Sequence, residues 1–126
     1  MAWNFLNGIP IYLQIADNMK LQIAGGAMPP GSRLPSVRDL ALQAGVNPNT
    51  MQRALSCLEA EGLVRTQSTN GRYVTEDMEK MKELRRKLSE AYIQEFFDNL
   101  KSLGMTEEEI LETAREWVQR NQKEVQ

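Results

Sequence analysis

Four polar side chains recur along one face of a helix that we expect over residues 48–61. At a helical period of 3.6, the apolar residues of this segment form a stripe on one side and the polar ones lie on the other. The stripe consists of Met51, Ala54, Leu55 and Leu58, and the polar face consists of Asn49, Gln52, Arg53 and Ser56. Amide side chains pair with adenine edges and guanidinium groups with guanine, so this face has the chemistry for reading bases in a major groove. Ordinary solvated helices carry the same residue types, so the face alone leaves both interpretations open.

The chain lacks the residues on which most enzymes and metal sites depend. It contains no histidine, which removes the commonest general base and the commonest metal ligand. Its single cysteine, Cys57, cannot form an internal disulfide and is expected to be a small buried side chain. The acidic run at residues 107–109 follows Thr106 at an expected helix start, where negative charge favours the positive end of the helix dipole. The sequence therefore predicts neither an enzyme nor a bound metal or cofactor.

Two short amphipathic helices joined by a tight turn are expected to project the polar face outward. The first spans residues 36–44 and begins at Ser36, whose hydroxyl is placed to cap it. The second spans residues 48–61 and follows Asn47, a favourable N-cap, with a proline at its first position. The connection at residues 45–46 has the length of a helix-turn-helix. This arrangement brings the second helix to a major groove.

The segments on either side complete a small domain. An apolar stripe predicts a first helix over residues 10–24, and the Pro- and Gly-rich loop after it contains Arg33, a candidate phosphate contact. After the second motif helix the period becomes alternating, which predicts two short strands within residues 63–75. Between the strands, Asn70 and Gly71 are expected to form a left-handed hairpin turn that lets the backbone approach DNA. Asn-Gly hairpins occur in many proteins, but the arginines on both strands favour the DNA interpretation.

Charge is distributed unevenly along the chain. The whole sequence has 15 Lys or Arg and 17 Asp or Glu, a net charge of −2. Residues 1–75 hold six of the basic and four of the acidic side chains, whereas residues 76–126 hold nine and thirteen. Five of the six basic residues in the first part are arginines, and they lie before, within and after the two-helix motif, as phosphate clamping would need. This asymmetry assigns nucleic-acid binding to the N-terminal part.

The N-terminal residues resemble the winged-helix DNA-binding domain of GntR-type bacterial transcription regulators. The similarity runs over residues 9–75 and rests on a long motif without gaps. The matching positions are Leu34-Pro35-Ser36, Arg38, Leu40-Ala41, Gly45-Val46-Asn47, Thr50, Ala54, Leu58, Gly62-Leu63, Gly71 and Tyr73-Val74. Many members have an arginine where this chain has Pro48, and the form Asn47-Pro48-Asn49-Thr50 resembles the short YtrA-type branch.

This resemblance implies which residues contact DNA. In the family, contacts come from the arginine that matches Arg38, from the first residues of the second motif helix and from the wing-tip glycine. With the residues identified above, the expected DNA-binding set is Arg33, Ser36, Arg38, Asn47, Asn49, Thr50, Gln52, Arg53, Asn70, Gly71 and Arg72. Within this set we expect Asn49 and Gln52 to read bases and Arg72 to clamp a phosphate.

A long helical pattern follows the wing, which is the pair of strands expected within residues 63–75. This pattern indicates that the chain binds another protein chain. It predicts one helix over residues 77–103 and a second over residues 107–122, which form an antiparallel hairpin. Two helices alone cannot enclose the aromatic side chains they carry. We therefore expect a homodimer, the role that the YtrA-type branch also implies, with a contact formed by Tyr92, Phe96, Phe97, Leu100 and Trp117. The chain then divides into a DNA-binding domain, 1–76, and a dimerisation region, 77–126.

The expected fold class is mainly α (α+β), a winged helix-turn-helix followed by a two-helix hairpin. No apolar run approaches a membrane span and no signal peptide is recognised, so a bacterial cytoplasmic protein is expected. The leading hypothesis is a dimeric repressor that binds a palindromic operator in double-stranded DNA. The alternative is a winged-helix module that binds a protein, which salt would weaken less. The second region is too small for a usual ligand cavity, so any small-molecule effector is expected at an interface.

Overall fold

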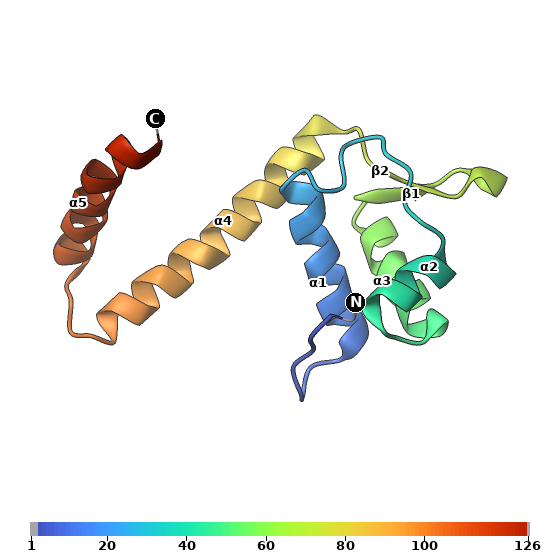
Figure 1. Ribbon diagram of the computed structural model, residues 1–126, viewed down its shortest axis with the longest axis horizontal. Helices are drawn as coiled ribbons and strands as arrows, with labels where there is room; N and C mark the ends of the chain where they lie inside the picture. Colours follow the sequence, from blue (N-terminus) through green and yellow to red (C-terminus); the bar gives the residue numbers. More distant parts are fainter. Residues whose placement is uncertain (1–2, 126) are drawn as a thin grey trace. The chain divides into compact units, whose positions relative to one another are not determined.

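The computed structural model describes residues 3–125, which belong to two compact units. One unit ends at Arg86 and the other begins at Lys87. Within the described residues there are five α-helices, one 3-10 helix and a two-stranded antiparallel sheet (Figure 1). Their order is α1 (Ile11–Ala24), α2 (Val37–Ala44), α3 (Pro48–Ala60), β1 (Val64–Thr66), η1 (Ser68–Asn70), β2 (Arg72–Val74), α4 (Met78–Lys101) and α5 (Glu107–Val125). The expected fold class, mainly helical with a small β-hairpin wing, is confirmed.

The core of the first unit forms where α1 and α2 pack on α3. Apolar residues at helical spacing put fully buried side chains on the facing sides of these helices. Those of α1 and α3 are Ile15, Met19, Ile23, Met51, Leu55 and Leu58. At the surface, an ion pair of 2.7 Å between Lys20 Nζ and Glu61 Oε2 joins α1 to the end of α3. Because one side of α3 is occupied by this core, its opposite side faces solvent.

Side-chain and backbone caps produce the tight turn between α2 and α3. The Ser36 hydroxyl accepts the N–H of Asp39 at 3.1 Å, and α2 ends at Gly45 in the left-handed conformation, with φ of 74°. The Oδ1 atom of Asn47 accepts the N–H of Asn49 at 2.7 Å and so caps α3. The predicted helix-turn-helix is therefore confirmed.

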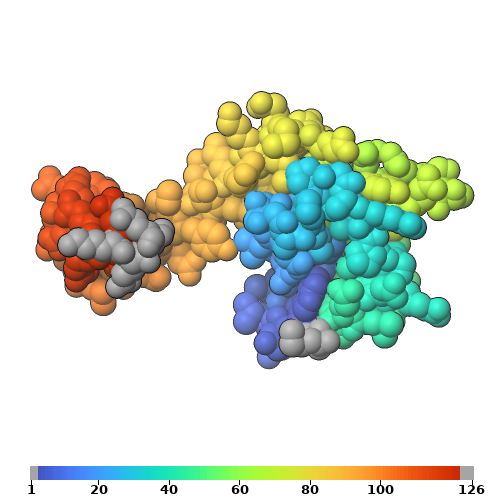
Figure 2. All heavy atoms as spheres, turned by 45° about the horizontal axis from the view of Figure 1, so that its top comes forward, coloured from blue at the N-terminus to red at the C-terminus, as the bar shows by residue number. Residues whose placement is uncertain are grey.

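The wing contains more pairing than the sequence indicated. Strands β1 and β2 are antiparallel, with Arg65 opposite Tyr73. On the other edge of β2, Arg33 forms a bridge with Tyr73, and the N–H of Leu34 donates to the carbonyl of Arg72 at 2.9 Å. Figure 2 shows the wing, in yellow-green, projecting from the first unit with the cyan segment that precedes α2 beside it. This extra pairing fixes the predicted loop around Arg33 against the wing.

The loop at the end of the wing differs from the expected hairpin turn. A 3-10 turn spans Ser68–Asn70, and two hydrogen bonds of 2.8 Å close it, from Asn70 N to Gln67 O and from Gln67 N to Gly71 O. Because this loop is longer than a two-residue hairpin, positive φ falls on Ser68 at 44° and Gly71 at 101°. The prediction of a left-handed turn at Asn70 and Gly71 was therefore wrong for Asn70.

The boundary between the two units lies within α4. Asp77 caps this helix, and its Oδ1 atom accepts the N–H of Glu79 at 3.0 Å. Met81 and Leu84 are both buried and belong to the first unit. The first turns of α4 thus contribute to the core of the first unit, whereas the sequence placed the division at residue 76.

The second unit consists of the rest of α4 together with α5. A capping box begins α5 at the expected helix start, since Thr106 Oγ1 accepts the N–H of Glu109 at 3.2 Å and Glu109 Oε1 accepts the N–H of Thr106 at 3.1 Å. Ile110 is fully buried, whereas larger apolar side chains of both helices are exposed. Among the described residues, no helix is long and apolar enough to cross a membrane.

Candidate nucleic-acid interface

The polar face of α3 is on the surface, as the sequence predicts, because Asn49, Gln52, Arg53 and Ser56 are all exposed. The Ser56 hydroxyl donates to the carbonyl of Gln52 at 3.0 Å, so the helix itself occupies this group. Among the described residues, the side-chain amides of Asn49 and Gln52 have no hydrogen-bond partner. Each amide offers donors and an acceptor to an external ligand.

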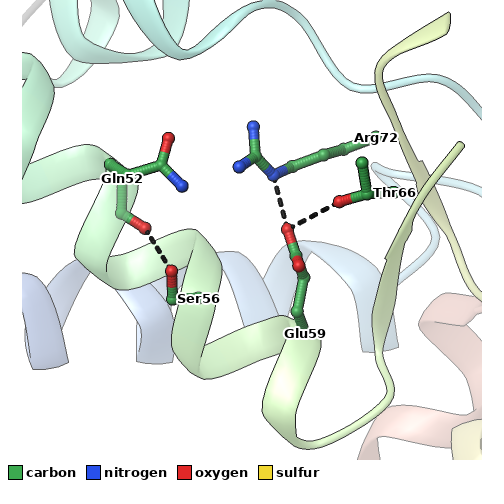
Figure 3. A network of polar contacts seen from close by, with 5 residues as sticks. All are labelled: Gln52, Ser56, Glu59, Thr66 and Arg72. Atoms are coloured by element: carbon green, nitrogen blue, oxygen red, sulfur yellow. Dashed lines mark hydrogen bonds and ion pairs between the residues drawn. The ribbon is translucent and has the colours of Figure 1, made fainter. Parts of the chain in front are cut away.

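A network of polar contacts attaches the wing to this helix (Figure 3). The Oε1 atom of Glu59 accepts from Arg72 Nε at 2.6 Å and from Thr66 Oγ1 at 3.0 Å. The side chains of Arg72 and Glu59 are 21% and 33% exposed, so solvent screens their ion pair only in part. The two terminal nitrogens of Arg72 point away from Glu59 in Figure 3 and remain available as donors. The network orders Arg72 without using all of its hydrogen-bonding capacity.

A groove lined by two arginines lies between the start of α2 and the wing. It has a volume of about 610 Å³, and its polar lining comes from Arg33, Ser36, Asp39 and Arg72. Gly71 also lines it, and a β-carbon at this glycine would lie 3.2 Å from Arg33 Nε. Two arginines and one aspartate line the groove, and Arg72 is paired with Glu59, so the Arg33 guanidinium is the group most available to an anion.

The predicted DNA-binding residues fall into groups on the first unit. Arg33, Ser36, Gly71 and Arg72 line the groove together. The exposed Arg38 on α2 and the exposed Asn70 in the wing loop are not among its lining residues. Asn47 uses its side-chain oxygen to cap α3. Thr50 is half-buried and lies beside Arg53, which is turned toward α1.

Sequence reasoning missed two residues that organise the interface. Glu59 was considered only for its charge, but its spacing of seven from Gln52 puts both on one side of α3, toward the wing. Tyr12 lies within the first helix that the sequence predicts, over residues 10–24, and no functional role was expected for it. Its ring instead supports the guanidinium of Arg53, with the Cζ atom 3.9 Å from the ring centroid. Its position at the start of α1 carried no signal of this contact.

Comparison with known proteins identifies the family of the chain. Residues 11–74, half of the sequence, match the family described as bacterial regulatory proteins, gntR family. The chain belongs to the GntR family. This match spans α1, the helix-turn-helix and the wing, so it covers the elements that form the interface. The GntR resemblance expected from the sequence is confirmed.

Relatives of this GntR protein are named as regulators and not as enzymes. The HTH-type transcriptional regulator YhcF of Bacillus subtilis is 43% identical over 108 residues, which cover 86% of this chain and 89% of YhcF. The transcriptional repressor YtrA of the same organism is 46% identical over 68 residues, which cover 54% of this chain and 52% of YtrA.

Solved structures agree with this assignment. A GntR-family regulator from Listeria monocytogenes has a TM-score of 0.79 at 32% identity, over 89% of this chain and 98% of that one. The DNA-binding domain of AraR in complex with operator ORX1 has a TM-score of 0.52 at 25% identity, over 60% of this chain and 93% of that one. The protein is a DNA-binding transcriptional regulator of the GntR family.

Replacing Arg72 with alanine should weaken binding to a selected duplex and to a scrambled duplex alike. If Arg72 binds a DNA phosphate, the slope of log affinity against log salt should fall by about one for each Arg72 in the complex. Fluorescence anisotropy across a salt series measures both quantities. Arg115→Ala is the matched control, because Arg115 pairs with Glu112 at 2.7 Å on α5, outside the family match. An unchanged slope for Arg72→Ala would contradict the assignment.

Proposed function

We propose that this GntR regulator is a homodimeric repressor that binds a palindromic operator in double-stranded DNA. The observation that carries the proposal is the pair of free amides, Asn49 and Gln52, on a helix to which Glu59 and Arg72 attach the wing. Helix α3, which carries the base-reading amides, and the wing, which carries a phosphate-binding arginine, are thereby held together in one unit. The structural likeness to AraR, which was solved with its operators, supports the use of this unit for DNA.

Asn49 and Gln52 supply the sequence specificity. A carboxamide matches adenine because it donates to N7 and accepts from the N6 amino group in the major groove. The family resemblance adds two nearby contacts, from Thr50 of α3 and from the exposed Arg38 of α2, and Asn47, the cap of α3, completes the set. Arg38 contacts mainly phosphate and reaches a base edge only secondarily.

The groove beside the wing receives the sugar-phosphate backbone. Arg33 and Arg72 provide its positive charge, and the Ser36 hydroxyl lies in the same lining. Asn70 and Gly71 lie at the end of the wing, where a glycine leaves room for a sugar-phosphate strand or the minor groove. These contacts determine the affinity and the orientation of the protein on DNA, whereas the α3 amides determine which base sequence it prefers.

Exposed aromatic side chains in the second unit support a homodimer. Tyr92, Phe96 and Trp117 are 57%, 42% and 58% exposed, and Phe97 and Leu100 are half-buried. The rings of Phe96 and Phe97 meet edge to face, with centroids 5.7 Å apart. Large exposed apolar side chains of this kind often mark an interface. A second copy related by a two-fold axis covers them and presents two α3 helices to two half-sites.

A repressor that acts by occupying its operator needs only a DNA-binding surface and a dimer contact. A dimer bound across a promoter excludes other proteins from the same DNA. Two relatives carry the name of transcriptional repressor: YtrA, and NagR of Bacillus subtilis, which is 38% identical over 84% of this chain and 41% of NagR. We place the protein in the bacterial cytoplasm, where the chromosome lies.

Selection of duplexes from a random pool by the wild-type chain tests the proposed function. We expect an inverted repeat whose half-sites are about one helical turn apart, or a multiple of it, as in other two-fold readers. Affinity for the repeat should fall steeply as salt is added. Enrichment of no sequence, together with salt-insensitive binding, would contradict DNA readout and favour the protein-binding alternative.

Replacing Gln52 with alanine should relax preference at one base pair in each half-site. The expected loss is about 1 to 3 kcal/mol on the selected duplex, because one bidentate base contact disappears. Binding to a scrambled duplex should hardly change. Ser56→Ala is the matched control on the same exposed face, since the Ser56 hydroxyl is already bonded to the helix. Equal losses on both duplexes for Gln52→Ala would show that another face docks.

Introducing a charge at Phe96 should dissociate the dimer. Phe96→Glu places a carboxylate in the proposed apolar contact, where burial of an unpaired charge is unfavourable. Sedimentation should show a dimer for the wild-type chain at micromolar concentration and a monomer for the variant. Leu42→Glu is the control, because Leu42 is an exposed apolar residue of the first unit, 73% exposed. A monomeric wild-type chain would refute the dimer.

A further inference from the structure

An open hollow of about 370 Å³ lies between the start of α1 and the start of α3. It is lined by Pro10, Ile11 and Tyr12 from the first helix region and by Thr50 and Arg53 from the second. None of these residues is acidic, and Arg53 supplies a positive charge. Different residues line the groove beside the wing, so the hollow is a separate feature of the first unit.

Arg53 is held at this hollow by an aromatic ring. Its Cζ atom lies 3.9 Å from the centroid of the Tyr12 ring, and Tyr12 is half-buried while Arg53 is exposed. A guanidinium group at this distance gains a cation–π attraction and loses rotational freedom. Among the described residues, the Arg53 guanidinium has no hydrogen-bond or ion-pair partner, so its five N–H donors are free for a ligand.

The contact also turns Arg53 away from the centre of the reading face. Asn49 and Gln52 point their free amides outward from α3, whereas the head group of Arg53 lies over a ring of α1. When a helix enters a major groove, the centre of its exposed face meets the base edges and its flanks meet the sugar-phosphate strands. The position of Arg53 is therefore that of a backbone contact.

We propose that Tyr12 is a positioning residue that holds Arg53 as a preformed clamp for a DNA phosphate. The Thr50 hydroxyl, in the same hollow, is a second donor to that phosphate. This inference rests on the proposed function, because it assumes that α3 enters the groove of DNA. It assigns Arg53 to the DNA backbone and not to the guanine edge that the sequence alone suggests.

The reading helix is then flanked by two arginines that are ordered before DNA binds. Arg53 is ordered by the Tyr12 ring on the α1 side, and Arg72 by the Glu59 carboxylate on the wing side. A side chain that is already fixed loses less conformational entropy on binding. Removing the ring should therefore weaken the phosphate contact although the charge remains.

Four variants of the full chain test the proposal: Arg53→Ala, Tyr12→Leu, Tyr12→Phe and the double variant Tyr12→Leu/Arg53→Ala. Each is titrated by anisotropy against the duplex that the wild-type chain selects and against a scrambled duplex, across a salt series. Arg53→Ala should weaken both alike and lower the salt slope by about one per subunit. Tyr12→Leu should weaken both about two- to fivefold. Tyr12→Phe keeps the aromatic face and should bind as the wild type does.

The double variant separates positioning from a general structural role. If Tyr12 acts through Arg53, adding Tyr12→Leu to Arg53→Ala should cause no further loss of affinity. The same loss in both backgrounds would overturn the proposal, as would an unchanged salt slope for Arg53→Ala. A loss for Arg53→Ala confined to the selected duplex would show base reading and also overturn it.

One further variant covers the case in which Tyr12→Leu does not fold. Arg53→Lys keeps the charge but loses the planar group that stacks on Tyr12, so it should weaken both duplexes at an unchanged salt slope. Wild-type affinity for Arg53→Lys would then overturn the role of the ring. A wild-type chain that binds neither duplex overturns the proposed function itself. Normal wild-type binding with an unaffected Arg53→Ala variant overturns only the clamp.

Discussion

Burial of one side of α3 against α1 and α2 is the constraint on which the first unit depends. Met51, Leu55 and Leu58 are fully buried, so the helix cannot rotate about its axis without exposing them to water. A fixed rotation determines which side chains face outward, and the free amides of Asn49 and Gln52 are among them. The choice of outward-facing residues thus follows from an apolar contact within the protein core.

Polar and aromatic contacts then order the charged residues on the two flanks of this helix, by different means. On the wing side a carboxylate holds Arg72, and the Glu59 charge partly offsets the cation that it positions. On the α1 side the ring of Tyr12 holds Arg53 without adding a charge. The two flanks therefore differ in how their arginine is ordered, since only Arg72 is paired with an acid.

Features that depend on neighbouring residues could be predicted from the sequence. The caps at Asn47 and Thr106 need only residues two or three positions apart, and helical periodicity located the helices that they start. The contact between Glu59 and Arg72 joins residues 13 positions apart, and Arg53 reaches Tyr12 on another helix. Periodicity contains no information about such pairings, because they depend on how the elements pack. The extra strand pairing beside β2 was missed for the same reason.

The conformation of Gly71 limits how the end of the wing can change during evolution. With φ of 101° and ψ of −158°, its backbone occupies a region that essentially only glycine adopts. A β-carbon there would also crowd the side chain of Arg33, 3.2 Å from its Nε atom. Every other amino acid is therefore disfavoured at Gly71 even in the absence of DNA. An invariant glycine at this position among relatives would record a backbone requirement, and variation that alters binding would have to arise at the neighbouring residues.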